Sequence, residues 1–375
     1  RKDNAVDLIK VGDTKILELF HGPTLAFKDI AMQLLGNFYE HYLKKNNQEI
    51  NVVVATSGDT GAAAIDAIKG KKNMNIFVLH PNEKVSIVQR KLMSTVKEKN
   101  VFNIAIEGNF DDCQNLVKSM FADKEFSNSI NMSGVNSINW ARIIAQAVYY
   151  FYTYFQVQDN RPINFSVPTG NFGDVYAGYL SKKMGLPINK LIVATNQNDI
   201  LHRAISNGNY KAENVTETNS PSMDIQIASN FERLIYDLND CDDNETRKIM
   251  NGIKDNGKYI ISKNNMEKIN KDFLSASMNE KEVLDIIKEV HIKYGIILDP
   301  HSAIGFGSLN KLKIDGNNIV LATAHPCKFP DAINKSIGVK PDLPDELKYV
   351  MDEKENYDII SNNIGKAQQY IKEKI

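Results

Sequence analysis

The sequence predicts an α/β protein built from mostly parallel β-sheets flanked by helices. Two observations carry this prediction. Short runs of β-branched residues alternate with longer amphipathic runs, and several strand-like runs stop at loops rich in Gly, Ser and Thr. Such an alternation implies a parallel sheet with helices packed on it. With 375 residues, of which 42% are hydrophobic, the chain is long enough for two domains with well-formed cores.

Each expected element rests on its local pattern. The strand at 50–55 is the run Ile-Asn-Val-Val-Val-Ala, and the helix after it, at 62–69, is rich in alanine. The helix at 143–155 is rich in Tyr and Phe, which indicates packing on both sides. In chain order, strands are expected at 16–20, 50–55, 76–80, 104–107, 163–167, 192–195 and 319–324, and helices at 30–43, 62–69, 85–97, 111–122, 143–155, 175–184, 280–294 and 301–309.

Two stretches have less regular patterns. Residues 207–256 are polar and rich in Asn, Asp and Ser, with one aromatic cluster at 231–236. We interpret them as an excursion with one or two helices. The C-terminal stretch is interpreted as helical and charged. The sequence shows no internal repeat and no low-complexity linker.

Composition excludes several classes of function. A net charge of -1 gives no positive excess for nucleic acid or an anionic membrane. No apolar run approaches the roughly 20 residues of a membrane span. The three cysteines lack CxxC spacing, which indicates a reducing, cytoplasmic setting, and the absence of an HExxH pair argues against a metal. We expect a monomer or weak dimer with neither nucleic acid nor a membrane as partner.

A lysine stands in an unusual setting near the start of the chain. Residues 21–29 read His-Gly-Pro-Thr-Leu-Ala-Phe-Lys-Asp. The Gly-Pro pair indicates a turn, and Thr24 is expected to cap the following helix, which places Lys28 in its first turn. The helix dipole and the apolar residues before Lys28 both favour the neutral amine, the form that acts as nucleophile or base. The alternative is a surface lysine that lies over a helix start.

Two strand–loop–helix junctions are suited to anions. At 168–174, Gly170 and Gly173 let backbone N–H groups converge on a phosphate at a helix start. This junction lacks the P-loop and GxGxxG patterns, so ATP and NAD fit it poorly, and a tight turn without a ligand is the alternative.

The second junction, at 56–61, reads Thr-Ser-Gly-Asp-Thr-Gly. Ser57 and Thr60 can hydrogen-bond an anionic substrate group, and Asp59 can orient a phenolic or hydroxyl oxygen. The alternative is that Thr60 or Asp59 caps the following helix.

A third polar group follows the last expected strand. Thr323 can reach a heterocycle nitrogen, and His325 and Lys328 come just after it, with ordinary loop polarity as the alternative. Together these features describe two anion pockets, a lysine with apolar neighbours and no metal. Pyridoxal phosphate, joined to Lys28 as a Schiff base and acting as an electron sink, would use all of them.

Six segments match one known family in order over nearly the whole chain: 21–29, 55–62, 136–142, 168–174, 194–198 and 323–329. They resemble the microbial threonine synthases, members of the tryptophan synthase β family of pyridoxal phosphate enzymes (fold type II). The HGPTLAFKD and ATSGDTG segments are the most specific. The resemblance implies two open, twisted, mostly parallel sheets with flanking helices and the cofactor at the domain interface.

The resemblance also implies an activity. A carbon–oxygen lyase of this family converts O-phospho-L-homoserine and water to L-threonine and phosphate, the last step of threonine biosynthesis, with Lys28 as Schiff-base lysine and proton carrier. The cofactor-binding residues implied are Lys28, Phe27, Asp59, Gly170, Asn171, Phe172, Gly173 and Thr323. The residues implied for substrate phosphate or carboxylate are Ser57, Thr60, Asn136, Arg142, Asp174 and Lys328.

The same resemblance implies a domain division. Residues 1–36 and 134–375 are expected to form a large cofactor-binding domain, and 37–133 a small mobile domain whose closure expels water. The family usually carries a longer region before the HGPT segment, which is expected to be trimmed or lost here. Two alternatives stay open: a phospholyase or dehydratase on the same scaffold, which adds no water at Cβ, and a non-catalytic homologue that binds pyridoxal phosphate.

Overall fold

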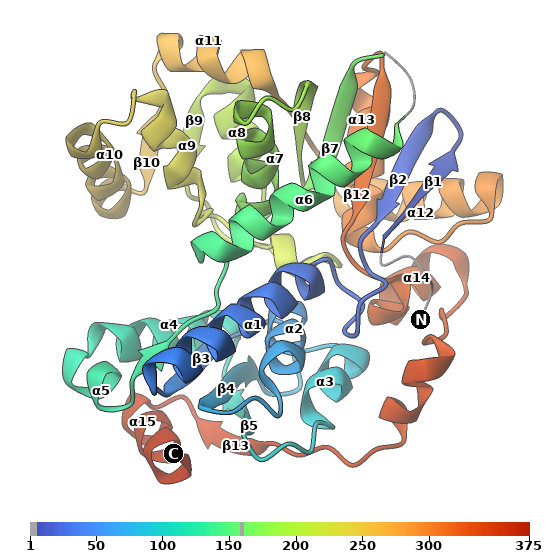
Figure 1. Ribbon diagram of the computed structural model, residues 1–375. Coiled ribbons are helices and arrows are strands. Elements are labelled where there is room, and N and C mark those ends of the chain that lie inside the picture. Colours follow the sequence, from blue (N-terminus) through green and yellow to red (C-terminus); the bar gives the residue numbers. More distant parts are fainter. Residues whose placement is uncertain (1–5, 158–160) are drawn as a thin grey trace. The chain divides into compact units, whose positions relative to one another are not determined.

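The computed structural model describes residues 6–157 and 161–375, and the chain divides into two compact units (Figure 1). The first unit comprises Arg1–His21 and Ile143–Pro341, and the second comprises Gly22–Arg142 and Asp342–Ile375. These units differ from the expected domain division at 22–36, 134–142 and 342–375. The mobility of the small domain stays a prediction.

The second unit is built on a five-stranded parallel sheet. Val52 and Val54 face one hydrophobic core and Val53 faces another, because successive side chains of a strand point to opposite faces. In spatial order the strands are β13 (Asp358–Ser361), β5 (Val101–Glu107), β4 (Met74–Pro81), β3 (Ile50–Ala55) and β6 (Met132–Ser133).

Helices cover both faces of this sheet (Figure 1). On the face of Val52 and Val54 lie α1 (Lys28–Asn46), α2 (Asp59–Ile68) and α3 (Ile87–Ser94). On the face of Val53 lie α4 (Phe110–Ala122), α5 (Lys124–Ser129) and α15 (Ile364–Lys374). The 3-10 helix η3 (Asp345–Met351) packs on the first of these cores.

Two packing contacts explain why the second unit is larger than the expected 37–133. A side chain at Gly36 would meet the carbonyl oxygen of Ala67, so α1 packs closely along α2 and brings the 22–36 segment with it. At the other end of the chain, β13 pairs in parallel with β5, with Ile360 opposite Ile106. Neither the packing of α1 on α2 nor the pairing of β13 with β5 has a local sequence signal.

The first unit is built on a six-stranded sheet. Its strands, in spatial order, are β1 (Asp7–Val11), β2 (Thr14–Glu18), β12 (Asn317–Ala322), β7 (Ile163–Pro168), β8 (Ile188–Thr195) and β11 (Phe273–Ser277). Only the β1–β2 pair is antiparallel. The carboxyl ends of the five parallel strands therefore meet at one edge, where sheets of this kind bind ligands.

Helices pack on both faces of this sheet as well. The hydroxyl of Ser166 donates a hydrogen bond of 2.7 Å to the carbonyl of Gly305 in α13 (Pro300–Leu312), whereas the neighbouring Phe165 contacts Tyr150 of α6 (Trp140–Gln156) on the opposite face. The other helices are α7 (Gly173–Lys183), α8 (Ile200–Asn207), α9 (Phe231–Leu238), α10 (Asp243–Asn256), α11 (Lys263–Asp272), α12 (Glu280–Tyr294) and α14 (Pro330–Ile337).

The polar excursion contains more structure than one or two helices. Besides α9 and α10 it holds the short strand β9 (Asn209–Lys211) and the 3-10 helix η1 (Pro221–Met223). β9 pairs with β10 (Lys258–Ile260) in an antiparallel two-stranded sheet. A second 3-10 helix, η2 (Pro326–Lys328), follows β12.

The expected α/β architecture with mostly parallel sheets is confirmed. β3 and α12 have the expected bounds, and the other expected elements agree within a few residues. The expectation of a helical C-terminal stretch is wrong in part, because β13 lies within it. β1 and β11 were not expected. Among the described residues, no helix combines the length and apolar character needed to cross a membrane.

Candidate active site

Lys28 is the first residue of α1, as the sequence predicted. Its side chain is 11% exposed, and Leu25 and Ala26 before it are buried. The Lys28 ammonium lies 4.7 Å from the centre of the Phe27 ring. The alternative of a lysine spread over an exposed helix start is therefore excluded.

Thr24 does not cap α1, contrary to the prediction. The helix begins after Phe27, and its first turn contains the buried Asp29. The Asp29 carboxylate accepts hydrogen bonds from the backbone N–H of Thr24, at 2.9 Å, and from the Thr24 hydroxyl. The hydrogen-bond acceptor is therefore Asp29, within the first turn of the helix, and not Thr24 before it. A carboxylate is favoured at this place because it lies at the positive end of the helix dipole.

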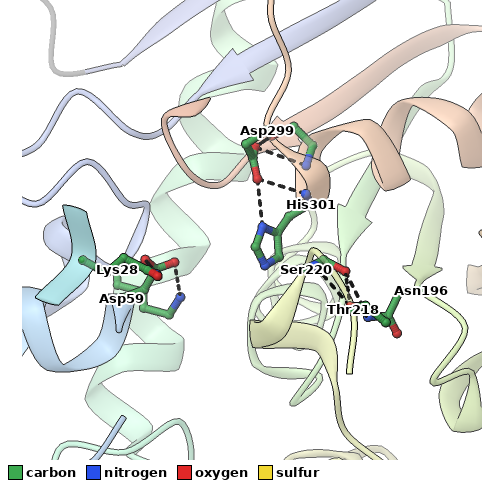
Figure 2. A network of polar contacts seen from close by, with 9 residues as sticks. Lys28, Asp59, Asn196, Thr218, Ser220, Asp299 and His301 are labelled. Carbon is green, nitrogen blue, oxygen red and sulfur yellow. Dashed lines mark hydrogen bonds and ion pairs between the residues drawn. The ribbon is translucent and has the colours of Figure 1, made fainter. Parts of the chain in front are cut away.

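Asp59 contacts Lys28, which the sequence did not predict. Its Oδ2 atom lies 3.5 Å from Lys28 Nζ (Figure 2). Asp59 is the first residue of α2 and does not cap it, because the preceding Gly58 is the cap residue. The carboxylate offsets the repulsion between the Lys28 ammonium and the dipole of α1.

The loop before α2 is organised by Thr56, a residue that sequence reasoning missed. The Thr56 hydroxyl oxygen accepts hydrogen bonds of 2.9 Å from the backbone N–H groups of Gly58 and Gly61. This is a local turn stabilised by a side chain, and the Thr-Ser-Gly pattern was its signal. Ser57 and Thr60, the predicted substrate-binding residues, are half-buried on this loop.

The loop before α7 has the geometry of an anion site. Phe172 has a positive φ of 64° and precedes a helix of 11 residues. Within the described residues, no acceptor is bonded to the backbone N–H groups of Gly170 through Gly173. Such a turn at a helix N-terminus presents several N–H donors to one anion.

Neighbouring residues hold this loop in place. The carbonyl of Asn171 accepts bonds of 3.1 Å from the backbone and side-chain N–H groups of Asn230, and its side-chain oxygen accepts one of 2.9 Å from the Ser229 hydroxyl. The ring of Phe172 is buried against Phe231 and Phe273. The side chains of Asn171 and Phe172 therefore serve the fold, and the backbone N–H groups are what the loop offers.

Asp174, in the first turn of α7, is a predicted substrate-binding residue with a structural contact. Its Oδ1 atom accepts a hydrogen bond of 3.1 Å from the Tyr150 hydroxyl, which also donates to the Asp174 carbonyl at 2.8 Å. Burial raises the pKa of Tyr150 well above its usual value, so the phenol stays a donor.

Asn136 and Arg142 differ in burial. Asn136 is exposed, whereas Arg142 is 3% exposed and its Nη1 donates a hydrogen bond of 2.7 Å to the carbonyl of Val135. A buried guanidinium needs such partners because desolvation of a charge is costly. The Arg142 side chain is therefore held in the turn that contains Asn136.

Two predicted site residues, Thr323 and Lys328, and their neighbour His325 follow β12 at the carboxyl edge of its sheet. Thr323 is 6% exposed and Lys328 is fully buried. His325 precedes η2, and its Nδ1 atom accepts a hydrogen bond of 3.2 Å from the backbone N–H of Cys327. The structure thus brings Thr323, His325 and Lys328 together on one short loop.

His325 is expected to make the protein less stable in acid. Burial, followed by the nearby His21, lowers the pKa of His325 from 6.5 to about 4. The unfolded chain binds the proton below about pH 6.5 and the folded chain only near pH 4. The stabilising contribution is therefore complete above pH 6.5 and is lost as the pH falls towards 4, by up to about 3 kcal/mol.

Urea unfolding at about pH 7 and about pH 4.5 measures this contribution. Replacing His325 with Asn keeps a side chain that can accept from the Cys327 N–H, and the loss of stability between the two pH values should become smaller. Some loss will remain, because burial also lowers the pKa of His80 and His202. Equal losses in the variant and the natural protein would contradict the prediction.

A buried polar network joins residues that the sequence did not single out, and Figure 2 shows Asn196, Thr218 and Ser220 of it. The Asp224 carboxylate accepts bonds from the Asn196 and Asn198 amides, at 2.8 and 2.9 Å, and from the Thr218 hydroxyl at 2.6 Å. Burial raises the pKa of Asp224, and these donors oppose that shift. The network fixes the 216–226 turn, which contacts Gly170 through the carbonyl of Ser222.

A second cluster, at the start of α13, was also missed. Asp299 caps α13, accepting from the N–H groups of His301 and Ser302 at 2.9 and 3.2 Å, and it accepts from the His301 ring at 2.8 Å (Figure 2). The Asp-Pro-His-Ser sequence, with Pro at the first helical position, is a recognisable cap signal.

Three residues with metal-ligating side chains lie close together in the first unit, a group that the sequence did not reveal. Asp7, Glu18 and His21 place one ligand atom each within 4.8 Å of one another, and all three are half-buried. His21 Nε2 and Glu18 Oε2 are 2.7 Å apart, a hydrogen bond that accounts for their proximity without an ion. These residues come together through the β1–β2 pairing, which no sequence spacing reveals.

Two family models match the chain. A family model described as pyridoxal-phosphate dependent enzyme matches residues 17–323, and one for the C-terminal region of threonine synthase matches residues 302–371. The first match covers most of the chain, and it includes Lys28, the loop at 170–173 and Thr323. The chain therefore belongs to the family of pyridoxal-phosphate-dependent enzymes, with the expected fold type II.

Similar proteins show to which group within this family the chain belongs. The chain is 45% identical over 364 residues to threonine synthase from Pseudomonas aeruginosa, covering 96% of this chain and 78% of the relative. It is 44% identical over 390 residues to that from Saccharomyces cerevisiae, covering 93% and 76%. The structure of threonine synthase from Brucella melitensis with pyridoxal phosphate bound has a TM-score of 0.96 and 47% identity, covering 100% of this chain and 81% of that one. Within its class, the chain belongs to the threonine synthases.

Proposed function

We propose that this chain converts O-phospho-L-homoserine and water to L-threonine and phosphate. The observation that carries the proposal is the contact between Lys28 and Asp59 at the first residues of two helices, in a chain that belongs to the threonine synthases. A desolvated lysine beside a carboxylate is the type of group that enzymes use as covalent anchor and base.

Pyridoxal 5′-phosphate is the proposed cofactor, because donors of this chain suit each of its parts. The backbone N–H groups before α7 suit its phosphate, and the Lys28 amine suits its aldehyde. The Thr323 hydroxyl suits its ring nitrogen. When bound, the cofactor supplies an electron sink for the substrate's Cα. The proposed cofactor-binding residues are Lys28, Phe27, Asp59, Gly170, Asn171, Phe172, Gly173 and Thr323.

Lys28 is the residue that we propose moves the substrate's protons. Its amine takes the proton from Cα, carries the proton of Cβ to Cγ, which the phosphate leaves, and returns a proton to Cα after water has added at Cβ, while the second proton of that water goes to the released phosphate. Asp59, 3.5 Å from Nζ, keeps the amine in position between these transfers. Positioned proton transfer of this kind contributes about 10²- to 10⁴-fold to a rate.

Buried cations and hydroxyl groups are proposed to hold the substrate's anions. Arg142 and Lys328 are both buried, where a positive charge is screened less than in water. They stabilise the phosphate as its bond to Cγ breaks. The proposed substrate-binding residues are Ser57, Thr60, Asn136, Arg142, Asp174 and Lys328.

We further propose a cytoplasmic enzyme that works as a monomer or weak dimer without a nucleic-acid partner. The three cysteines form no disulfide, which suits a reducing compartment. The net charge of -1 gives no excess of positive charge for nucleic acid. Sedimentation at several protein concentrations tests the oligomeric state.

The product formed from O-phospho-L-homoserine tests the activity. With pyridoxal phosphate supplied, mass spectrometry and a phosphate assay should find threonine and phosphate in equal amounts. Phosphate accompanied by 2-oxobutyrate would instead identify a phospholyase or dehydratase. A protein that binds the cofactor but releases no phosphate from this substrate would contradict the proposal.

A further inference from the structure

Gln89 of α3 lies against the carboxylate of Asp59. Its side-chain Nε2 donates a hydrogen bond of 2.8 Å to Asp59 Oδ1, while Asp59 Oδ2 faces Lys28. Gln89 is 2% exposed and Asp59 3%, so water does not compete for this contact. Sequence patterns did not single out Gln89, because it lies 30 residues from Asp59.

A second contact holds the other end of the Gln89 amide. The Ser86 hydroxyl, which caps α3, donates a hydrogen bond of 3.0 Å to Gln89 Oε1. An ionised carboxylate only accepts hydrogen bonds, so the amide nitrogen has to face Asp59. Ser86, Gln89, Asp59 and Lys28 thus form one connected chain of polar contacts.

The backbone makes room for this contact. Gly58 has a φ of 138°, and a Cβ atom there would lie 2.6 Å from the side-chain amide carbon and nitrogen of Gln89. Only glycine allows the amide to pass this close to the loop and reach Asp59. The close approach at Gly58 therefore serves the same contact.

We propose that Gln89 is a positioning residue that holds Asp59 ionised and turned towards Lys28. The inference rests on the proposed function, in which Lys28 carries the cofactor. Donation from an amide stabilises the charged form of a buried carboxylate. That negative charge in turn favours the protonated form of the Lys28 nitrogen. Gln89 acts on the reaction only through Asp59.

The chain offers a matched control between α1 and α2. Gln33 of α1 donates a hydrogen bond of 2.6 Å to Asp66 of α2, another glutamine–aspartate contact between two helices. Asp66 pairs with Lys69 instead of Lys28. Replacing Gln33 with Met removes a contact of the same kind without touching the proposed pathway.

The test compares Gln89→Met, Gln33→Met, Asp59→Asn and the double variant of Gln89 and Asp59. Each protein is loaded with pyridoxal phosphate, and the visible absorbance of the cofactor bound at Lys28 is followed as a function of pH. The midpoint of this change should move to lower pH by about one unit in Gln89→Met and at least as far in Asp59→Asn. Gln33→Met should keep the natural midpoint.

The double variant shows whether Gln89 acts through Asp59. Its midpoint should equal that of Asp59→Asn, because Gln89 then has no carboxylate to position. A purely structural role predicts a loss of urea stability in Gln89→Met with no shift of the midpoint. That result, an upward shift in Gln89→Met, or additive shifts in the double variant would each overturn the inference.

A Lys28→Ala variant separates this inference from the proposed function. If Lys28 carries the cofactor, the variant loses the pH-dependent absorbance of the covalently bound form. Retention of that absorbance would overturn the role of Lys28 itself. Loss of the absorbance together with an unchanged midpoint in Gln89→Met would overturn only the role of Gln89.

Discussion

Replacing Lys28 with alanine is expected to lower the rate of phosphate release from O-phospho-L-homoserine by at least about 10³-fold. The variant loses both the amine that anchors the cofactor and the group that moves the substrate's protons. The buried Asp59 carboxylate also loses its ion-pair partner, so some loss of stability is expected, and urea unfolding measures it separately from the rate. Phosphate release and threonine formation, measured with excess pyridoxal phosphate, check the prediction.

Lys69→Ala is the matched control for this variant. Lys69 also forms an ion pair with an aspartate of α2, at 2.7 Å from Asp66, but its side chain is more exposed. Its removal should leave the rate of phosphate release unchanged. If Lys28→Ala kept more than about a tenth of the natural rate, the assignment of Lys28 as base would be wrong.

The fold was predictable wherever a segment carried its own signal. The β-branched run at 50–55 and the capped amphipathic helix at 280–294 have the expected bounds, since burial on two faces and on one face leave different periods in sequence. β13 had no such signal. It is a short, partly exposed edge strand that is defined by its pairing with β5.

The candidate site likewise has residues that the sequence predicted and residues that it did not. Lys28 and the loops at 56–61 and 170–173 were found because turn residues and helix starts follow one another in sequence. The partners of these residues were not found. Gln89, Ser229 and the Asp224 network reach the loops through tertiary contacts, which leave no spacing to recognise.

The wrong cap assignment at Thr24 has a similar cause. Thr24 was expected to accept a hydrogen bond from α1, but it donates two to Asp29 inside the helix. Both arrangements use the same residue types within a few positions. Only the backbone conformation decides between them, and Leu25 with its positive φ of 58° sets that conformation.

Replacing Gly170 with alanine is expected to weaken the binding of pyridoxal phosphate by about 10- to 100-fold. A Cβ atom at this position would lie 2.6 Å from the carbonyl oxygen of Ser222, and 3.3 Å from the Cα of Met223. Both are backbone atoms of the 216–226 turn, which the Asp224 network holds rigid. The loop at 170–173 must therefore move, and its N–H groups lose their common direction.

Titration of the apoprotein with pyridoxal phosphate measures this loss, and Gly252→Ala provides the control. Gly252 lies in α10 with no atom near the place of a Cβ, so alanine there should stabilise the protein by up to about 1 kcal/mol and leave cofactor affinity unchanged. Ser229→Ala removes one hydrogen bond to Asn171 and should weaken binding less than Gly170→Ala does. Natural affinity in Gly170→Ala would mean that the cofactor phosphate does not depend on this loop. The order of the three variants, with Gly170→Ala weakest and Gly252→Ala unchanged, follows from how directly each substitution displaces the backbone N–H groups.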